Sequence, residues 1–289
     1  MDYTIRHSTH YQYEHPVGSS YQSLHLTPRQ SARQTVSHAN IQVSPTPLNL
    51  ETRPDFFGNQ VTDVFLRDPH DELVILAESR VSVWAVENVL LDLSPSWEQT
   101  AVLARQCRSE DAREAGRFCF PSPHITIDGA YDYAAGLMAP GKPLLRLAME
   151  LTEKIYADFE YRGGVTEVYT PIPDVLESRA GVCQDFAHLG IACLRAYGLP
   201  ARYVSGYLLT RPPEGQPRLT GADASHAWFS VWCPEFGWVD FDPTNNLQTQ
   251  TEHITLGWGR DYSDVSPTRG YIHGGGNQTL NVAVDVIPV

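Results

Sequence analysis

The sequence contains no hydrophobic run long enough to cross a bilayer. Its longest aliphatic stretches, such as LVILA at residues 73–77, are much shorter than the roughly 20 residues that a membrane helix needs. Basic residues are also in the minority: 21 lysines and arginines stand against 34 aspartates and glutamates, and the formal net charge is −13. A negative chain repels nucleic acid and anionic membrane surfaces. We therefore expect neither nucleic acid nor a membrane as a partner.

Three further features are absent. The first residues, MDYTIRHSTHYQYEHP, have no basic segment followed by an apolar stretch, so they do not predict a signal peptide. No glycine-rich phosphate loop lies between a predicted strand and a predicted helix. The five cysteines are an odd number and indicate reduced thiols rather than a disulfide framework: Cys107, Cys119, Cys183, Cys193 and Cys233. We expect a cytoplasmic protein that needs no cofactor.

The first part of the chain has the pattern of a β domain. The 289 residues suffice for two domains. Residues 3–13 alternate between apolar and polar side chains, which predicts a half-buried strand. More short strands follow, and Gly58 and Asn59 between two apolar runs indicate a hairpin. This regular spacing predicts a β-sandwich-like domain over residues 1–88.

The remaining residues, 89–289, change character. SWEQTAVLARQCRS begins with a serine that can cap a helix. PLLRLAMELTEKIYADFEY places Leu144, Ala148, Leu151 and Ile155 on one helical stripe. Three strands then follow a further helix, and a polar, proline-rich loop at residues 211–224 separates the first two. We expect a helical region, then helices packed on an antiparallel sheet.

The stretch GVCQDFAHLGIACLRAYGLPARYVSGY, residues 181–207, places Cys183 at the start of a predicted amphipathic helix. A helix N-terminus offers free backbone N–H groups and the positive end of the helix dipole, and both favour an ionised thiol. The same N–H groups can hold the oxyanion of a tetrahedral intermediate. Cys183 is therefore a candidate nucleophile.

A thiolate nucleophile needs an imidazole partner, and the imidazole needs an orienting group. His226 lies in the predicted strand SHAWFSVW, and Asp242 ends the predicted strand in GWVDFDPT. If these strands pair antiparallel through the turn CPEFG, His226 and Asp242 lie near the same end of the hairpin. Asp240 shares the face of Asp242 and is the alternative orienting group.

The segments GVCQDFAHL, GLPARYVSGY, DASHAWFSVW and FGWVDFDPTNN, in this order within residues 176–246, closely resemble the bacterial transglutaminase-like family. Residues 1–88 resemble the N-terminal β-domain of many such proteins, and HITLGWGRDYSDVSP resembles their C-terminal extension. The resemblance implies an α+β fold with a papain-like transglutaminase core. It also implies a triad of Cys183 as nucleophile, His226 as base and Asp242 as its orienting residue.

The expected chemistry is acyl transfer on amide bonds through a thioester. We expect hydrolysis of a peptide or protein substrate, as in a cysteine protease or amidase. Transamidation of protein glutamine is the alternative, because water and an amine compete for one thioester. A scaffold or binding protein with an inactive triad is a third possibility. Because the β-domain contains no cysteine, we expect it to contribute one wall of the cleft that leads to Cys183.

Several other residues invite a functional interpretation. Asp185 and His188 are expected to make hydrogen bonds within the helix region. A zinc site of Cys183, His188 and His226 is not expected, because the sequence has no close CxxC or HxxxH pair. Trp228 is expected in the core, where it would shield the imidazole of His226. HGGGNQ at residues 273–278 has no GxSxG motif to accompany it, so a loop is expected there.

Overall fold

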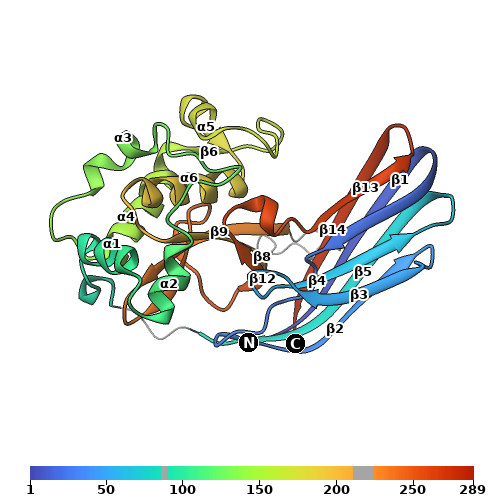
Figure 1. Cartoon of the computed structure of the whole chain (residues 1–289), viewed down its shortest axis with the longest axis horizontal. Helices are drawn as coiled ribbons and strands as arrows, with labels where there is room; N and C mark the ends of the chain where they lie inside the picture. The colour runs from blue at the N-terminus through green and yellow to red at the C-terminus, as the bar shows by residue number, and fades with distance from the viewer. Residues whose placement is uncertain (86–89, 211–223) are drawn as a thin grey trace, which may run out of the picture.

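The computed structural model describes residues 1–85, 90–210 and 224–289. A bent antiparallel sheet lies on one side of the molecule, and a mixed body of helices and strands lies on the other (Figure 1). The predicted α+β class is therefore confirmed. The predicted boundary between residues 88 and 89 lies outside the described residues. The same holds for the predicted loop at residues 211–224, except for its last residue.

The bent sheet contains strands from both ends of the chain (Figure 1). Its members are β1 (Asp2–Leu24), β2 (Gln34–Ser44), β3 (Asn49–Pro54), β4 (Gln60–Leu66), β5 (His70–Val83), β13 (Thr268–Gly274) and β14 (Gln278–Pro288). The long strand β1 holds the sheet together, because its first half pairs with β5 and β14 and its second half with β4 and β13. The sandwich-like domain thus takes the form of one continuous sheet.

The alternation that predicted β1 places its apolar side chains in two buried clusters. Tyr3 and Ile5 are 1% exposed and face the rest of the molecule. Val17 and Leu24 pack with residues of β4 and β5 in a second cluster inside the bent sheet. Gly58 has a φ of +75° in the turn between β3 and β4, which confirms the hairpin predicted there.

The second body is built on a five-stranded antiparallel sheet in the order β11-β10-β9-β8-β12. Its strands are β8 (Ala201–Leu208), β9 (Ala224–Cys233), β10 (Gly237–Asp242), β11 (Leu247–Gln248) and β12 (His253–Gly259). The helices are α1 (Trp97–Gln106), α2 (Glu110–Gly116), α3 (Ala130–Ala134), α4 (Leu144–Asp158), α5 (Ile172–Ser178) and α6 (Cys183–Ala196). Short strands β6 (Glu160–Tyr161) and β7 (Ala180–Gly181) pair in parallel beside the start of α6.

The helix α6 is the central helix of this body. Its side chains, from Phe186 to Leu194, are almost entirely buried against α4 and the sheet. Gly190 lets α6 approach β9 closely, because a Cβ atom there would lie 2.7 Å from the ring of Phe229. This close contact sets the distance between the start of α6 and the strand that carries His226.

The two bodies meet through a buried apolar cluster. Tyr207 and Leu209 at the end of β8, with Ile254 and Leu256 of β12, pack against β1, β5 and β14. The N-terminal sheet is thus fixed on the edge of the five-stranded sheet. Among the described residues, no helix is long and apolar enough to span a membrane, and the cytoplasmic location stays a prediction.

The close packing at Gly190 can be tested by Gly190→Ala, with Gly136→Ala as the matched control. A Cβ at Gly136 meets no atom within 4 Å. At Gly190 the steric cost of about 1–3 kcal/mol for overpacking should exceed the gain of about 0.5–1 kcal/mol in helix propensity. We expect urea unfolding to show a loss of stability for Gly190→Ala and none for Gly136→Ala. Equal stabilities would contradict the close packing.

Candidate active site

Cys183 is the first residue of α6, as predicted. The first backbone bond of the helix runs from the N–H of Phe186 to the oxygen of Val182, at 3.2 Å. The N–H groups before Phe186 therefore have no acceptor within the helix. Asp185 fixes this end, since its Oδ2 accepts from the Val182 N–H at 2.8 Å and from the Thr166 hydroxyl at 2.7 Å.

The hydrogen-bonding role predicted at the helix fits Asp185, whereas His188 bonds outside the helix. Gly181 leaves room for Asp185, whose Oδ2 would lie 2.7 Å from a Cβ at that position. His188 is buried, and its Nε2 accepts from the backbone N–H of Tyr262 at 3.2 Å. Burial lowers the pKa of His188 to about 3, so the ring is neutral. His188 acts as an acceptor for the chain beside β12.

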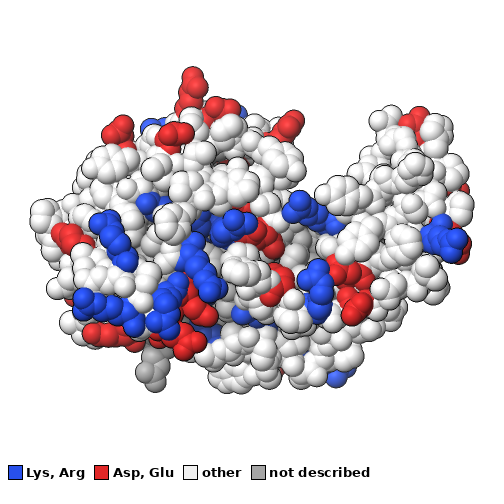
Figure 2. Space-filling view, in the orientation of Figure 1, with Lys and Arg blue, Asp and Glu red and all other residues white. Residues whose placement is uncertain are grey.

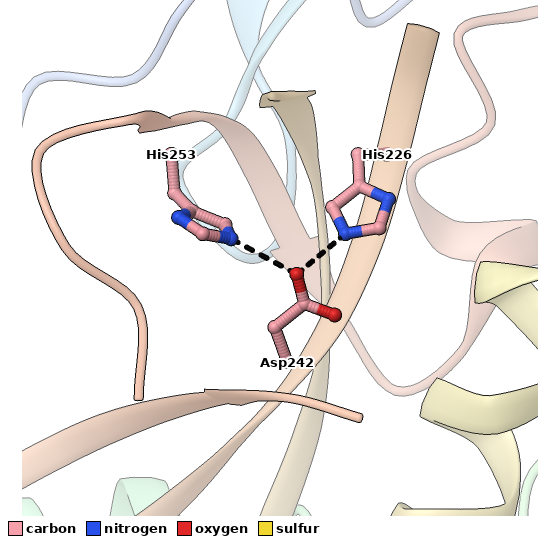
Figure 3. A group of neighbouring side chains, drawn as sticks. All are labelled: His226, Asp242 and His253. Carbon is pink, nitrogen blue, oxygen red and sulfur yellow. Dashed lines mark hydrogen bonds and ion pairs between the residues drawn. The ribbon is translucent and has the colours of Figure 1, made fainter. Parts of the chain in front are cut away.

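The strands β9 and β10 pair antiparallel and bring His226 to Asp242 as the sequence predicted. The Nε2 atom of His226 lies 2.7 Å from Oδ2 of Asp242 (Figure 3). The other ring nitrogen, Nδ1, points away from Asp242 (Figure 3). His226 and Cys183 line the same cleft, and Cys183 contributes to the raised pKa of His226. Because Nε2 is held by Asp242, Nδ1 is the nitrogen available to the thiol.

The carboxylate of Asp242 is completely buried and is surrounded by donors. Besides His226, its Oδ2 accepts from Nε2 of His253 at 3.0 Å (Figure 3). It also accepts from Nδ2 of Asn245 at 2.7 Å. Its Oδ1 accepts from the backbone N–H of Thr244 at 2.9 Å and that of Asn245 at 3.3 Å. These donors stabilise the ionised carboxylate.

This arrangement moves two pKa values in opposite directions. Burial alone would lower the pKa of His226, but the hydrogen bonds and charges of Asp242 and Cys183 raise it to about 10. Burial alone would raise the pKa of Asp242, but the hydrogen bonds from His226, His253 and Asn245 hold it well below its usual range. At neutral pH the structure therefore favours an imidazolium beside a carboxylate.

Asp240, the alternative orienting residue, has different partners. Its Oδ2 accepts from Nε1 of Trp228 at 3.2 Å and lies 3.9 Å from Nη1 of Arg33. The indole of Trp228 is fully buried, with its ring 6.1 Å from that of His226. Trp228 therefore lies beside the imidazole, and Asp240 bonds Trp228 rather than His226.

A cleft of about 340 Å³ adjoins the thiol and lies between the two bodies. Cys183 and His226 line one side, and Thr9, Leu280 and Val282 from β1 and β14 line the other. The molecule is visibly hollowed between the bent sheet and the helical body (Figure 2). The bent sheet thus forms a wall of the cleft, and part of that wall comes from the C-terminal strand β14.

The structure separates the residues weighed for a zinc site. His188 faces Tyr262, as described above, rather than joining His226 and Cys183. Among the described residues, one other group could hold a metal ion: His226, Asp242 and His253. The distances in this group are those of hydrogen bonds, so an ion would have to displace the protons that join the three side chains. Hydrogen bonding explains their proximity.

Two residues of this cluster were missed in the sequence. Asn245 lies in the DPTNN segment, where an asparagine shortly after an aspartate in a turn gives some local signal. His253 begins β12, eleven positions after Asp242, and its role depends on the pairing of β12 with β8. No local pattern distinguishes it from an ordinary strand residue. HGGGNQ forms the turn between β13 and β14 and contacts Glu14 and His15.

The pKa of His226 provides a direct test of the site. In Asp242→Asn the charge that opposes burial is lost, so we expect the pKa of His226 to fall well below 10. Asp240→Asn is the matched control, because Asp240 bonds Trp228 and its loss should leave His226 near 10. NMR titration of the imidazole signals measures both. An unchanged pKa in Asp242→Asn would contradict the proposed interaction.

Comparisons with known proteins agree with this geometry. Residues 3–82 match the bacterial transglutaminase-like N-terminal region, and residues 131–243 match the transglutaminase-like superfamily. An uncharacterized protein of Mycobacterium tuberculosis is 41% identical over 296 residues, which cover 99% of this chain and 92% of that protein. A Mycobacterium leprae protein is 33% identical, covering 98% of this chain and 97% of its own length.

Two further relatives bear on fold and chemistry. A protein-glutamine gamma-glutamyltransferase of Pseudomonas aeruginosa is 38% identical over 84 residues, 29% of this chain and 12% of that protein. A crystal structure of a candidate cysteine protease from Cytophaga hutchinsonii covers 100% of this chain and 91% of its own, with 21% identity and a TM-score of 0.76. That likeness shows a shared fold. The chain therefore belongs to the bacterial transglutaminase-like family, within a superfamily of cysteine-dependent enzymes.

Proposed function

We propose that this protein hydrolyses amide bonds of peptides or proteins through a thioester on Cys183. The observation that carries the proposal is the placement of Cys183 at the N-terminus of α6, beside His226, whose Nε2 is held at 2.7 Å by Asp242. A thiol, an imidazole and an orienting carboxylate in this order form a nucleophilic triad.

The first half of the reaction forms the thioester. With the proton of Cys183 on Nδ1 of His226, the thiolate attacks the carbonyl carbon, and the carbonyl electrons move to the oxygen. The free N–H groups at the start of α6 donate to this oxyanion. When the intermediate collapses, the C–N bond breaks and the leaving amine or ammonia takes the proton from His226.

The second half of the reaction releases the acyl group. Water enters and gives one proton to His226 while its oxygen attacks the thioester carbon. The C–S bond then breaks, and the carboxylic acid leaves as the thiolate and imidazolium of Cys183 and His226 are restored. Asp242 keeps the ring oriented and stabilises the imidazolium throughout, because its own pKa is held low.

Transamidation is the second candidate reaction. An amine that enters in place of water would attack the same thioester and form a new amide, with His226 again accepting a proton. The name of the Pseudomonas aeruginosa relative favours this candidate. The shifted pKa values of His226 and Asp242 argue against an inactive scaffold, because strongly perturbed pKa values cluster at functional sites.

We expect activity to depend on all three residues, but unequally. Cys183→Ala and His226→Ala should abolish turnover, because each removes a group that forms or breaks a bond. Asp242→Asn should retain more activity, since it keeps a hydrogen-bonding group and loses the charge. Asp240→Asn should act like the native protein. Mass spectrometry of a peptide library with and without added amines measures the products and separates hydrolysis from transamidation.

Labelling with iodoacetamide at mildly acidic pH serves as the control for an active thiol. Cys183 should react before Cys107, which is the exposed competitor. Burial raises the pKa of Cys119 to about 11 and that of Cys233 to about 12, so both should react slowly. Faster labelling of Cys107, or native turnover by His226→Ala, would rule out the triad.

The wall of the cleft should select the substrate. Leu280 is 51% exposed and lines the cleft, whereas Ile287 on the same strand is 48% exposed and does not. We expect Leu280→Ser to raise KM for peptide substrates without a comparable loss of kcat, because it removes apolar contact area. Ile287→Ser should leave both constants unchanged. Equal kinetics for the two variants would show that this wall does not contact substrate.

A further inference from the structure

A second cavity, of about 410 Å³, lies on the other side of the five-stranded sheet from α6. Alternate residues of β9 face opposite ways: Phe229 packs in the cluster with α6, and Trp228 lines this cavity. The N-terminal domain closes it with residues 31–34 and Val83. It shares no lining residue with the cleft at Cys183.

Arg202 supplies a buried cation to this cavity. Its guanidinium is stacked between two indoles, 4.2 Å from the ring centre of Trp238 and 3.7 Å from that of Trp258. The side chain is 7% exposed, and its Nε has no hydrogen-bond partner among the residues that the structure describes. Stacking occupies the two faces of a guanidinium but leaves its in-plane N–H groups free to donate. The guanidinium of Arg202 is therefore held in place by the two indoles, while its Nε–H donor has no acceptor among the described residues.

The charges that line the cavity do not balance. Among the described lining residues, Asp240 is the one carboxylate. It already accepts from Trp228 and lies 3.9 Å from Arg33. Arg33 bonds Thr249 through its terminal nitrogens, while its Nε has no partner. The two arginines of the lining therefore carry one more charge than Asp240 balances, in a cavity whose other walls mix aromatic, aliphatic and uncharged polar side chains.

We propose that this cavity binds a small organic carboxylate with an apolar body, and that Arg202 holds the carboxylate. A carboxylate matches the planar donor fork of arginine, and an anion restores the charge balance. Phe236 and Trp238 also line the cavity and provide apolar surface for the rest of the molecule. This site is independent of the proposed reaction at Cys183.

Two further features agree with the proposal. Burial lowers the pKa of Arg202 to about 9, and the charge of Asp240 opposes this shift only in part. His253 also lines the cavity with its ring, and the Nε2 of that ring bonds Asp242. The cavity therefore adjoins the hydrogen-bonded cluster that orients His226.

Calorimetric titration of the full chain with three probes of similar shape tests the proposal. The probes are phenylacetate, phenylacetamide and 2-phenylethylamine. We expect saturable binding of phenylacetate, binding of the amide weaker by about ten-fold or more, and none of the amine, because a charge-assisted hydrogen bond is about twice as strong as a neutral one. Equal binding of acid and amide, or no saturable binding of phenylacetate, overturns the proposal.

Two variants locate the site. Arg202→Met removes the guanidinium and should weaken phenylacetate binding about ten-fold or more. Arg29→Met is the matched control: Arg29 stacks on the same Trp258, at 3.6 Å, but does not line the cavity. Native affinity in Arg202→Met contradicts the assignment. If that variant does not fold, Arg33→Met and the three probes on the native chain decide the question.

Discussion

The fold and the candidate site depend on one buried negative charge. The carboxylate of Asp242 has no contact with solvent, and an isolated charge in such a place would be very unfavourable. Its donors come from β9, from β12 and from the turn that follows β10. The hydrogen bonds that make the charge tolerable also fix His226 in one orientation. Removing any of these segments would leave the buried charge with fewer donors.

The five-stranded sheet separates two environments. On one side α6 packs so closely on β9 that Gly190 leaves no space for a methyl group, and the end of this helix carries the thiol. On the other side three indoles and two arginines meet the N-terminal domain. Asp242 and His253 join the two sides, because His253 contacts both the carboxylate and the second cavity. A shift of His253 on the side of the second cavity would therefore also move its hydrogen bond to Asp242.

Local patterns predicted much of this architecture. The stripe of α6, the alternation in β1 and the turn at Gly58 are properties of short segments, and each has a periodicity or a turn residue that reveals it. The hairpin of β9 and β10 was also predictable, because its turn is short, and with it the approach of His226 to Asp242.

What could not be predicted depends on contacts between distant segments. His253 reaches Asp242 only because β12 pairs with β8, and strand order is not encoded in any one segment. The same holds for β13 and β14, which were predicted as part of a C-terminal extension but pair with β1. Arg202 looked like an ordinary strand residue, since its indole partners come from β10 and β12.

The pairing of β14 with β1 also has a consequence for biosynthesis. Tyr3 lies opposite Pro288, so nearly the whole chain separates the two partners in sequence. During translation β1 leaves the ribosome long before β14. Until β14 is synthesised, one edge of β1 has unpaired backbone groups, and such an edge can associate with other chains. The last strand of the bent sheet, and the cleft wall with it, form after synthesis of the body that carries the thiol.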